Sequence, residues 1–163
     1  MSKRGYFKKN KELKKIILIF LFISITSFSN AKVIEPKNFL TSFDVVRIQL
    51  NALKNNDKHY KDFGIKQVWL FAHPDNKKVT GPYEKFKTMI YGDQYKLLLN
   101  HESSKISLIT NNLDTYVYRV EILTKDKKLF YYEWHVKKGN SDGCNDCWFT
   151  SAVSVPVNQG NTI

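Results

Sequence analysis

The sequence predicts an α+β fold in which N-terminal helices pack on a curved antiparallel sheet. In the first half of the chain after the leader, apolar residues recur at intervals of three and four, which is the spacing of helices. From Tyr95 onward the period changes to two, and β-branched and aromatic residues dominate, which is typical of strands. Both halves have apolar surface to bury, so we expect the helices to cover one face of the sheet.

Residues 1–31 have the organisation of a secretory signal peptide. Seven Lys and Arg against the single acidic residue Glu12 precede the apolar run Ile16–Ile25, and the leader closes with small residues at Ser29 and Ala31. This order predicts cleavage after Ala31 and a periplasmic or secreted protein. The apolar run is shorter than the about 20 residues of a comfortable membrane span, so no stable span is expected after cleavage. A retained N-terminal anchor is the alternative.

The rest of the chain is expected to form a single α+β domain over residues 32–156, with a flexible tail over residues 157–163. No internal repeat or low-complexity linker divides it. The net charge of +11 falls to +5 without the leader, because 19 basic and 14 acidic residues remain. These basic residues are scattered and form no stripe, so we expect no nucleic-acid partner.

Three helices are expected before the sheet. The first lies in SFDVVRIQLNALKNND, with Ser42 as its N-cap and the polar run from Asn55 at its end. The second follows Gly64, in IKQVWLFA. The third begins at Pro82, because proline at the first helical position loses no internal hydrogen bond, and it ends at Gly92.

Five strands are expected, in the segments YKLLL, KISLIT, TYVYRVEIL, KLFYYEWHV and CWFTSAVSV. In the third and fourth of them, alternate residues such as Tyr118 and Trp134 form an apolar face, and Arg119 and Glu133 belong to the opposite face. This alternation is typical of an antiparallel sheet with one covered face and one wetter face.

Four segments, VVRIQLNAL, VWLFAHPDNKKVTGPYEKFKTMI, YKLLLNH and CWFTSAVSVP, resemble a family of uncharacterised exported domains, a domain of unknown function. That family is similar to the cone-shaped α+β superfamily of ketosteroid isomerase, scytalone dehydratase and nuclear transport factor. The resemblance covers Phe43 to Pro156 and implies a cystatin-like cone. It implies function only loosely, since such folds carry enzymes, binders and structural adaptors alike. The family has a small polar residue where this chain has His73, which argues against a catalytic histidine there.

The stretch FAHPDNKKVTGPYEKF places His73 two residues before Asp75, and a carboxylate so close could orient a histidine as a general base. A chain corner explains the same residues. Pro74 pushes His73 into an extended conformation, and Asp75 and Asn76 are suited to bonding the backbone amides of a turn. The sequence favours the corner, and we assign no catalytic residue.

Cys144 and Cys147 form a C-x-x-C pair, which in an exported chain favours a small-loop disulfide. Free thiols and metal or redox use are the alternatives. The residues after the pair predict a strand, whereas thioredoxin-like chemistry uses this motif at a helix N-terminus. Zinc would need two further ligands, for which His101 and His135 are conceivable, but no paired histidine motif supports them. We expect no metal and no cofactor.

Aromatic side chains are the candidates for lining a cavity between sheet and helices. A concave apolar pocket with a few hydroxyl groups is the usual site of a small ligand, and an aromatic stripe that simply forms the core is the alternative. The candidate ligand-binding residues are Trp69, Tyr83, Tyr116, Tyr118, Tyr132 and Trp134.

Three hypotheses about function follow. The favoured one is an exported, non-enzymatic binder of a small apolar ligand or a protein partner. The second is an isomerase or dehydratase, which requires an acid–base group inside the cone, whereas the strand pattern places Glu133 and His135 on the other face. The third is an oligomeric structural or accessory protein, such as a homodimer formed through the outer sheet face.

Overall fold

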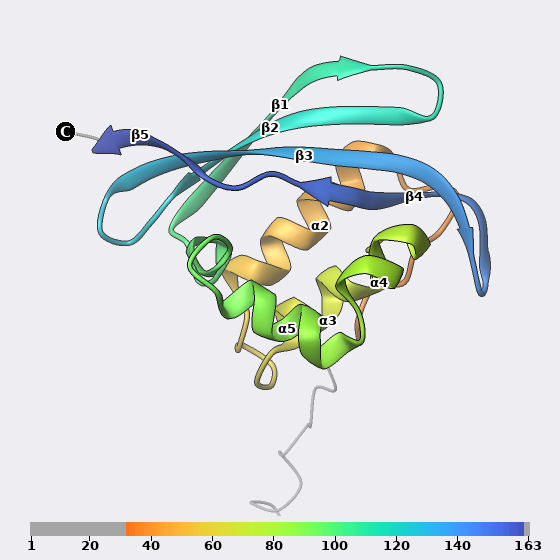
Figure 1. The fold of residues 1–163 in the computed structure, drawn as a ribbon, viewed down its shortest axis with the longest axis horizontal. Helices are drawn as coiled ribbons and strands as arrows, with labels where there is room; N and C mark the ends of the chain where they lie inside the picture. Colours follow the sequence, from red (N-terminus) through yellow and green to blue (C-terminus); the bar gives the residue numbers. More distant parts are fainter. Residues whose placement is uncertain (1–31, 162–163) are drawn as a thin grey trace, which may run out of the picture. The chain divides into compact units, whose positions relative to one another are not determined.

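The computed structural model describes residues 32–161. Residues 1–31, where the sequence predicts a signal peptide, and residues 162–163 lie outside the described part. Figure 1 shows helices beneath an open antiparallel sheet, which confirms the predicted α+β class. Within residues 32–161, no helix combines the length and the apolar character needed to cross a bilayer.

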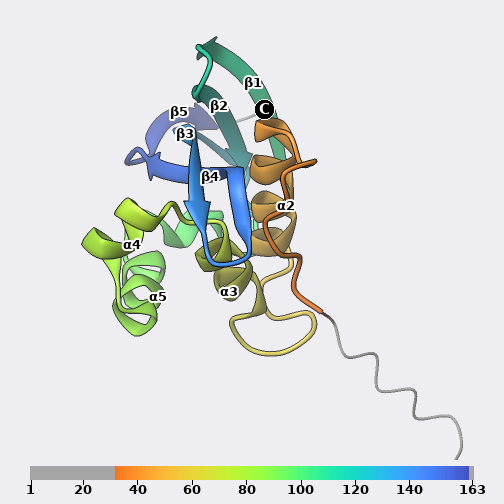
Figure 2. The same ribbon diagram turned by 90° about the vertical axis from the view of Figure 1, so that its right-hand side faces the viewer.

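The helical segments come first in the described chain. They are α2 (Ser42–Lys54), α3 (Phe63–Leu70), α4 (Pro74–Thr80), α5 (Tyr83–Tyr91) and the short 3-10 helix η1 (Lys96–Leu98). Figure 2 shows α3 between α2 on one side and the pair α4 and α5 on the other.

The strands follow in one sheet. They are β1 (Ser103–Asn111), β2 (Thr115–Leu123), β3 (Lys128–Ser141), β4 (Cys144–Val153) and β5 (Val157–Asn161). All neighbouring strands are antiparallel, in the order β1-β2-β3-β4. Because β2 covers one edge of β3, the two C-terminal strands share the other edge: β5 pairs with the start of β3 and β4 with its end.

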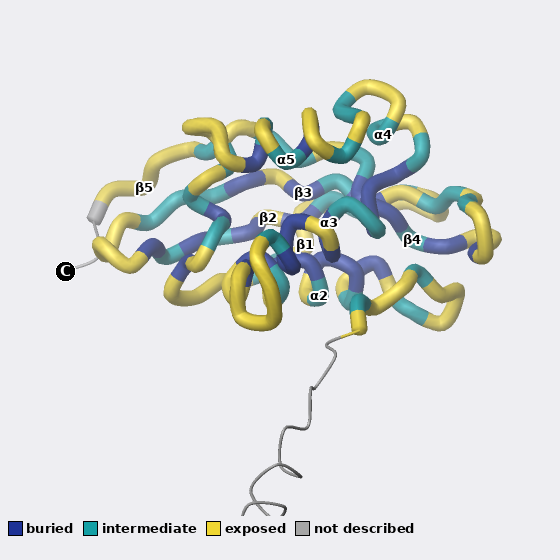
Figure 3. Tube along the Cα trace, turned by 90° about the horizontal axis from the view of Figure 1, so that it is seen from below, coloured by how far each residue is buried: buried dark blue, intermediate teal, exposed yellow. Residues whose placement is uncertain are grey.

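The predicted alternation in β2 and β3 is confirmed. Tyr118 and Trp134 face the helices and are buried, whereas Arg119 and Glu133 on the opposite face are exposed. Figure 3 shows buried stretches along the central strands and α3, with exposed residues in the connections and also along α4, β1 and β5. Val46, Leu50 and their neighbours on α2 complete the core.

Helix α2 begins with a capping box at Thr41 instead of the predicted cap at Ser42. The Thr41 hydroxyl oxygen accepts the backbone N–H of Asp44 at 3.1 Å, and the Asp44 carboxylate accepts the backbone N–H of Thr41 at 3.1 Å. Ser42 is buried, and its hydroxyl pairs with that of Tyr118 at 2.7 Å. Ser42 therefore joins α2 to the sheet and leaves capping to the exposed threonine.

The secondary structure predicted for two segments was wrong. YKLLL forms η1 and its flanking turns instead of a strand, because the leucine run has no two-residue alternation and no strand pairs with it. The expected turn after Pro74 is the helix α4. None of its residues is buried, so it has no apolar stripe from which a helix could be recognised.

The predicted tail also differs from the structure, since Val157–Asn161 form β5. Strand β3 extends beyond the predicted KLFYYEWHV and has 14 residues. Its first residues would leave an open edge, and β5 covers that edge by pairing with Lys128–Tyr131.

The chain just before α2 is held by a buried glutamine of α3. The side-chain amide of Gln67 donates to the carbonyl oxygen of Ile34 at 2.6 Å, and its oxygen accepts the backbone N–H of Ile34 at 2.7 Å. Gln67 thus pairs with Ile34 as a neighbouring strand would.

Helices α2 and α3 lie close together at Gly64, which packs against the carbonyl group of Ala52. The buried Asn56 lies in the connection and accepts the backbone N–H of Ile65 at 3.1 Å. A Cβ atom at position 64 would overlap the Ala52 carbonyl, so only glycine allows this crossing.

We expect Gly64→Ala to lower the free energy of unfolding by at least about 2 kcal/mol, although alanine favours helix more than glycine does. Urea unfolding measures the change. Asn51→Ala, on the exposed side of α2, is the control and should stay within about 0.5 kcal/mol of wild type. Equal stability of Gly64→Ala and wild type would contradict the close crossing.

Candidate functional site

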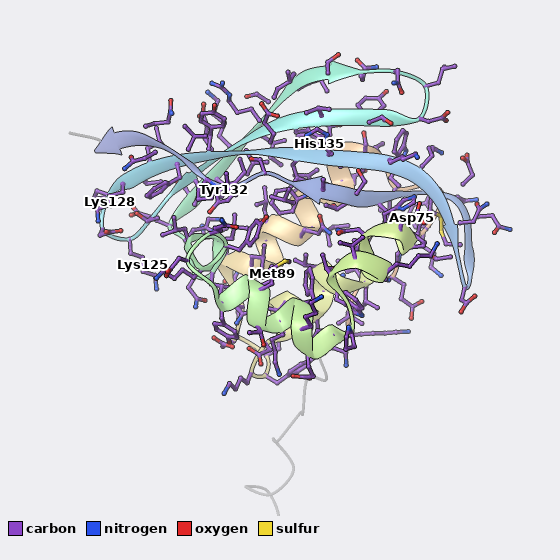
Figure 4. All side chains as sticks on the ribbon, in the orientation of Figure 1. Asp75, Met89, Lys125, Lys128, Tyr132 and His135 are labelled. Carbon is purple, nitrogen blue, oxygen red and sulfur yellow. A yellow bond between two sulfur atoms is a disulfide. The ribbon has the colours of Figure 1, made fainter. Side chains whose placement is uncertain are left out.

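A cavity of about 160 Å³ lies between the inner face of β3 and β4 and the helices. Its floor is buried and includes Gln49, Trp134 and Thr150, and α5 contributes Phe86 and Met89 to its wall. Figure 4 shows Met89 on α5, in the space between that helix and the sheet. The cavity is therefore enclosed by helices on one side and by two strands on the other.

Part of the cavity lining is exposed to solvent. The partly or fully exposed lining residues are Asn76 and Thr80 on α4, Met89 on α5, Tyr95, and Ser151, Ala152 and Val153 on β4. Helix α4, which the sequence did not predict, thus contributes two residues to this part of the lining.

Three polar side chains pair with one another at the floor. The Gln49 carbonyl oxygen accepts the Thr150 hydroxyl at 2.6 Å and lies 3.1 Å from the Trp134 indole N–H, which also points at the Thr150 oxygen at 2.9 Å. The exposed fractions are 0% for Gln49, 1% for Trp134 and 3% for Thr150. We call these three residues the polar floor. Buried polar groups of this kind are normally hydrogen-bonded, and pairing here keeps them compatible with an apolar cavity.

The structure gives the six aromatic candidates different positions. Of these six residues, Trp134 alone lines the cavity. Tyr132 is fully buried and donates its hydroxyl to the carbonyl oxygen of Gln94 at 3.0 Å. Burial raises the pKa of this phenol. Figure 4 labels Tyr132 on the inner side of β3.

The other four candidates pack in two groups. Tyr116 and Tyr118 stack with centroids 6.1 Å apart near the start of α2. Trp69 contacts Tyr83 and Phe86 at centroid distances of 6.1 Å and 5.1 Å, on the helical side of the core. Four of the predicted ligand-binding residues therefore belong to packing outside the cavity.

Sequence reasoning missed Gln49 and Thr150. A signal for Gln49 was available, because it lies on the apolar stripe of its helix, between Val46 and Leu53. A polar residue at such a position needs a buried partner. Which partner it finds depends on the pairing of β3 with β4, which the helix sequence does not contain.

His73 lies at the corner between α3 and α4, outside the cavity lining. Its Nδ1 accepts the backbone N–H of Asp75 at 3.2 Å, which caps α4, and its ring packs edge-on against Phe149. The Asp75 carboxylate is exposed and pairs with Lys78 at 2.8 Å, and this ion pair lowers the pKa of Asp75. The two residues fix the backbone at the corner and do not converge on an enclosed space.

Glu133 and His135 lie on the outer face of β3, with the carboxylate 3.8 Å from the His135 Nε2. Figure 4 labels both Asp75 and His135, one at the corner helix and one on the strand. Among the residues lining the cavity, none is a carboxylate, a histidine, a lysine or an arginine. The cavity offers apolar contact, shape and neutral hydrogen-bonding groups.

Cys144 and Cys147 lie at disulfide distance at the tip of the β3–β4 hairpin, with Cα atoms 6.0 Å apart. Both are buried against Phe149. Within residues 32–161, no group of three or more His, Cys, Asp and Glu side chains is arranged to hold a metal ion.

Comparisons of this chain with known protein families, with curated proteins and with solved structures found no match. The cavity and its polar floor are therefore the basis on which function can be assigned.

We expect reduction of the Cys144–Cys147 bond to lower the free energy of unfolding by about 2 kcal/mol, since it closes a very short loop. Thiol titration of protein from an oxidising compartment should find no reactive thiol before reduction and two after it. Replacing both cysteines with serine gives a control that should be insensitive to reductant. Two reactive thiols before reduction would contradict the disulfide.

His101 is a second buried histidine, directly after the turn that follows η1. One ring nitrogen, Nδ1, lies 2.8 Å from the carbonyl oxygen of Leu98, so it carries the proton and donates it. The other, Nε2, is buried without a partner among the described residues. Burial lowers the pKa of His101 from its ordinary value of 6.5, because a second proton would be buried without an acceptor.

We expect His101 to make folding stability fall as the pH drops below 6.5. In that range the unfolded chain binds a proton at His101 and the folded chain does not, so protonation favours unfolding. Urea unfolding between about pH 7 and about pH 5 measures the slope, and His101→Phe should flatten it. An equal slope in wild type and variant would contradict the assignment.

Proposed function

We propose that this is an exported protein that binds a small, mainly apolar molecule in the cavity between β4 and helices α4 and α5, without transforming it chemically. The observation that carries the proposal is a pocket of about 160 Å³ with an apolar wall and a hydrogen-bonded polar floor. Small-molecule sites commonly combine these two properties.

The size of the cavity limits the ligand. A cavity of about 150 Å³ is large enough to hold a benzene ring in another protein. The pocket here has a similar volume, and Phe86, Met89 and Leu98 offer it apolar contact. The ligand is accordingly about the size of one six-membered ring with a small substituent.

Export is supported by the composition of residues 1–31 and by the cysteine pair at disulfide distance. Disulfides persist in oxidising compartments and are rare in the cytosol. The resemblance to the cone-shaped superfamily agrees with a ligand between helices and sheet and belongs to the same proposal.

Binding is favoured over the isomerase or dehydratase alternative by the chemistry of the lining residues. Proton transfer next to a carbonyl needs a base whose pKa suits the working pH. The ionisable side chain that lines the cavity is the phenol of Tyr95, which donates to the carbonyl oxygen of Val153 at 3.0 Å and whose pKa is raised by burial. A phenol held in this way is a poor base.

We expect toluene to raise the thermal unfolding temperature of the wild-type protein, because a ligand that binds only the folded state stabilises it. Met89→Phe places a stiffer ring in the cavity and should weaken toluene binding about tenfold, a loss of about 1.4 kcal/mol. Differential scanning fluorimetry over a series of toluene concentrations gives both affinities.

Met89→Leu, which changes the cavity volume little, is the matched control and should bind toluene as wild type does. Absence of stabilisation in wild type by toluene and by related small rings would contradict the proposed function. Equal binding by wild type and Met89→Phe would show that the ligand binds elsewhere.

A further inference from the structure

We propose that the cavity selects neutral ligands that carry a hydrogen-bond acceptor, such as a small cyclic ketone, and that one side-chain N–H of Gln49 binds that acceptor. The inference rests on the proposed ligand binding and specifies its chemistry. It follows from three observations: the orientation of the Gln49 amide, the number of its donors, and the absence of charge in the lining.

The orientation of the Gln49 amide is fixed by Trp134. An indole N–H can only donate a hydrogen bond. The Gln49 atom that faces it at 3.1 Å must therefore be the carbonyl oxygen and not the nitrogen. The Thr150 hydroxyl, at 2.6 Å from the same oxygen, donates its proton there because its own oxygen faces the indole N–H.

The amide nitrogen of Gln49 then has two protons to place. Within residues 32–161 it has one partner, the carbonyl oxygen of Val68 at 3.4 Å, which is a long hydrogen bond. Val68 also lines the cavity. The second N–H is left without a protein acceptor on a side chain that is 0% exposed.

A buried donor without an acceptor is costly, and a ligand that supplies the acceptor removes that cost. Gln49 belongs to the lining of the cavity, so a ligand there is within reach of its amide. The polar floor consequently gives the pocket a preference for one chemical group as well as a shape.

The acceptor has to be neutral. No Lys or Arg lines the cavity, so a carboxylate or phosphate would be buried without a countercharge. The half-buried Lys77 lies outside the lining, with its ammonium 5.5 Å from the centre of the Trp69 ring. A carbonyl or ether oxygen on an apolar ring satisfies both the amide and the wall.

Cyclohexanone and methylenecyclohexane form a suitable probe pair, because they differ only in an exocyclic oxygen or CH2 group. The preference is the ratio of the two dissociation constants, measured by ligand-induced thermal stabilisation for wild type, Gln49→Met and Gln67→Met. In Gln49→Met the Trp134 N–H keeps the Thr150 oxygen at 2.9 Å as its acceptor. Gln67 is an equally buried glutamine that binds Ile34 outside the cavity lining, so Gln67→Met is the matched control.

We expect Gln49→Met to reduce the preference for cyclohexanone about tenfold, the effect of one buried hydrogen bond. Gln67→Met should keep the wild-type preference. An unchanged preference in Gln49→Met, or an equal loss in both variants, would overturn the inference and leave ligand binding intact. Failure of both probes to stabilise wild type would overturn the proposed function together with the inference.

A second measurement uses wild-type protein and so does not depend on the folding of a variant. In a ¹H–¹⁵N correlation spectrum, cyclohexanone should shift one of the two Gln49 side-chain amide protons, and methylenecyclohexane should shift neither. Equal shifts with both probes, or no shift with cyclohexanone bound, would show that this amide does not bind the acceptor. If only water occupies the site in the presence of cyclohexanone, the Gln49 amide protons do not shift. That outcome would also overturn the inference.

Discussion

The arrangement of helices on the sheet depends on the hydrogen bonds among Gln49, Trp134 and Thr150. These residues come from α2, β3 and β4, and each is buried. A sliding of α2 by one turn would leave an indole N–H and an amide in an apolar core, which costs far more than an imperfect apolar contact does. Apolar packing alone allows several positions of a helix on a sheet, and the polar floor selects one of them. The cavity lies beside this contact because the three side chains bond to one another and leave the adjoining space to apolar groups.

The corner at His73 has a role in this arrangement. Between α3 and α4 the backbone forms a short parallel bridge to β4, in which Thr150 donates to the carbonyl of Phe71 and accepts from the N–H of His73, both at 2.8 Å. Thr150 therefore contacts the corner through its backbone and the polar floor through its side chain. The bridge places the start of α4 beside β4, where Asn76 and Thr80 of this helix join the lining of the cavity. A stretch that looks catalytic in the sequence acts by positioning the chain.

Sequence alone predicted the faces of β2 and β3 because a period of two assigns each residue to a side without any knowledge of its partners. It predicted α2 and α5 from their apolar stripes, because such a stripe can also be recognised without any knowledge of its packing partners. It could not predict α4, whose residues are all outside the core, and it mistook the leucines before His101 for a strand. The site was harder still. Trp134 was among the predicted residues. A cavity, however, arises where side chains from segments far apart in the sequence fail to fill a space. The sequence of any one segment does not show where this happens.

Strand β3 is long enough for its two ends to belong to different regions of the sheet. On the edge away from β2, its end pairs with β4, which contributes Thr150 and three further residues to the cavity lining, and its start pairs with β5. The crossover between those partners is held by Ser154, whose backbone N–H donates to the carbonyl of Glu133 at 3.0 Å and whose hydroxyl accepts the N–H of the same residue at 2.9 Å. These two hydrogen bonds fix the chain between β4 and β5, and no residue of β5 lines the cavity. Spectroscopic labels or immobilisation tethers attached along β5 would consequently report on the molecule, or hold it on a surface, from positions outside the lining of the pocket.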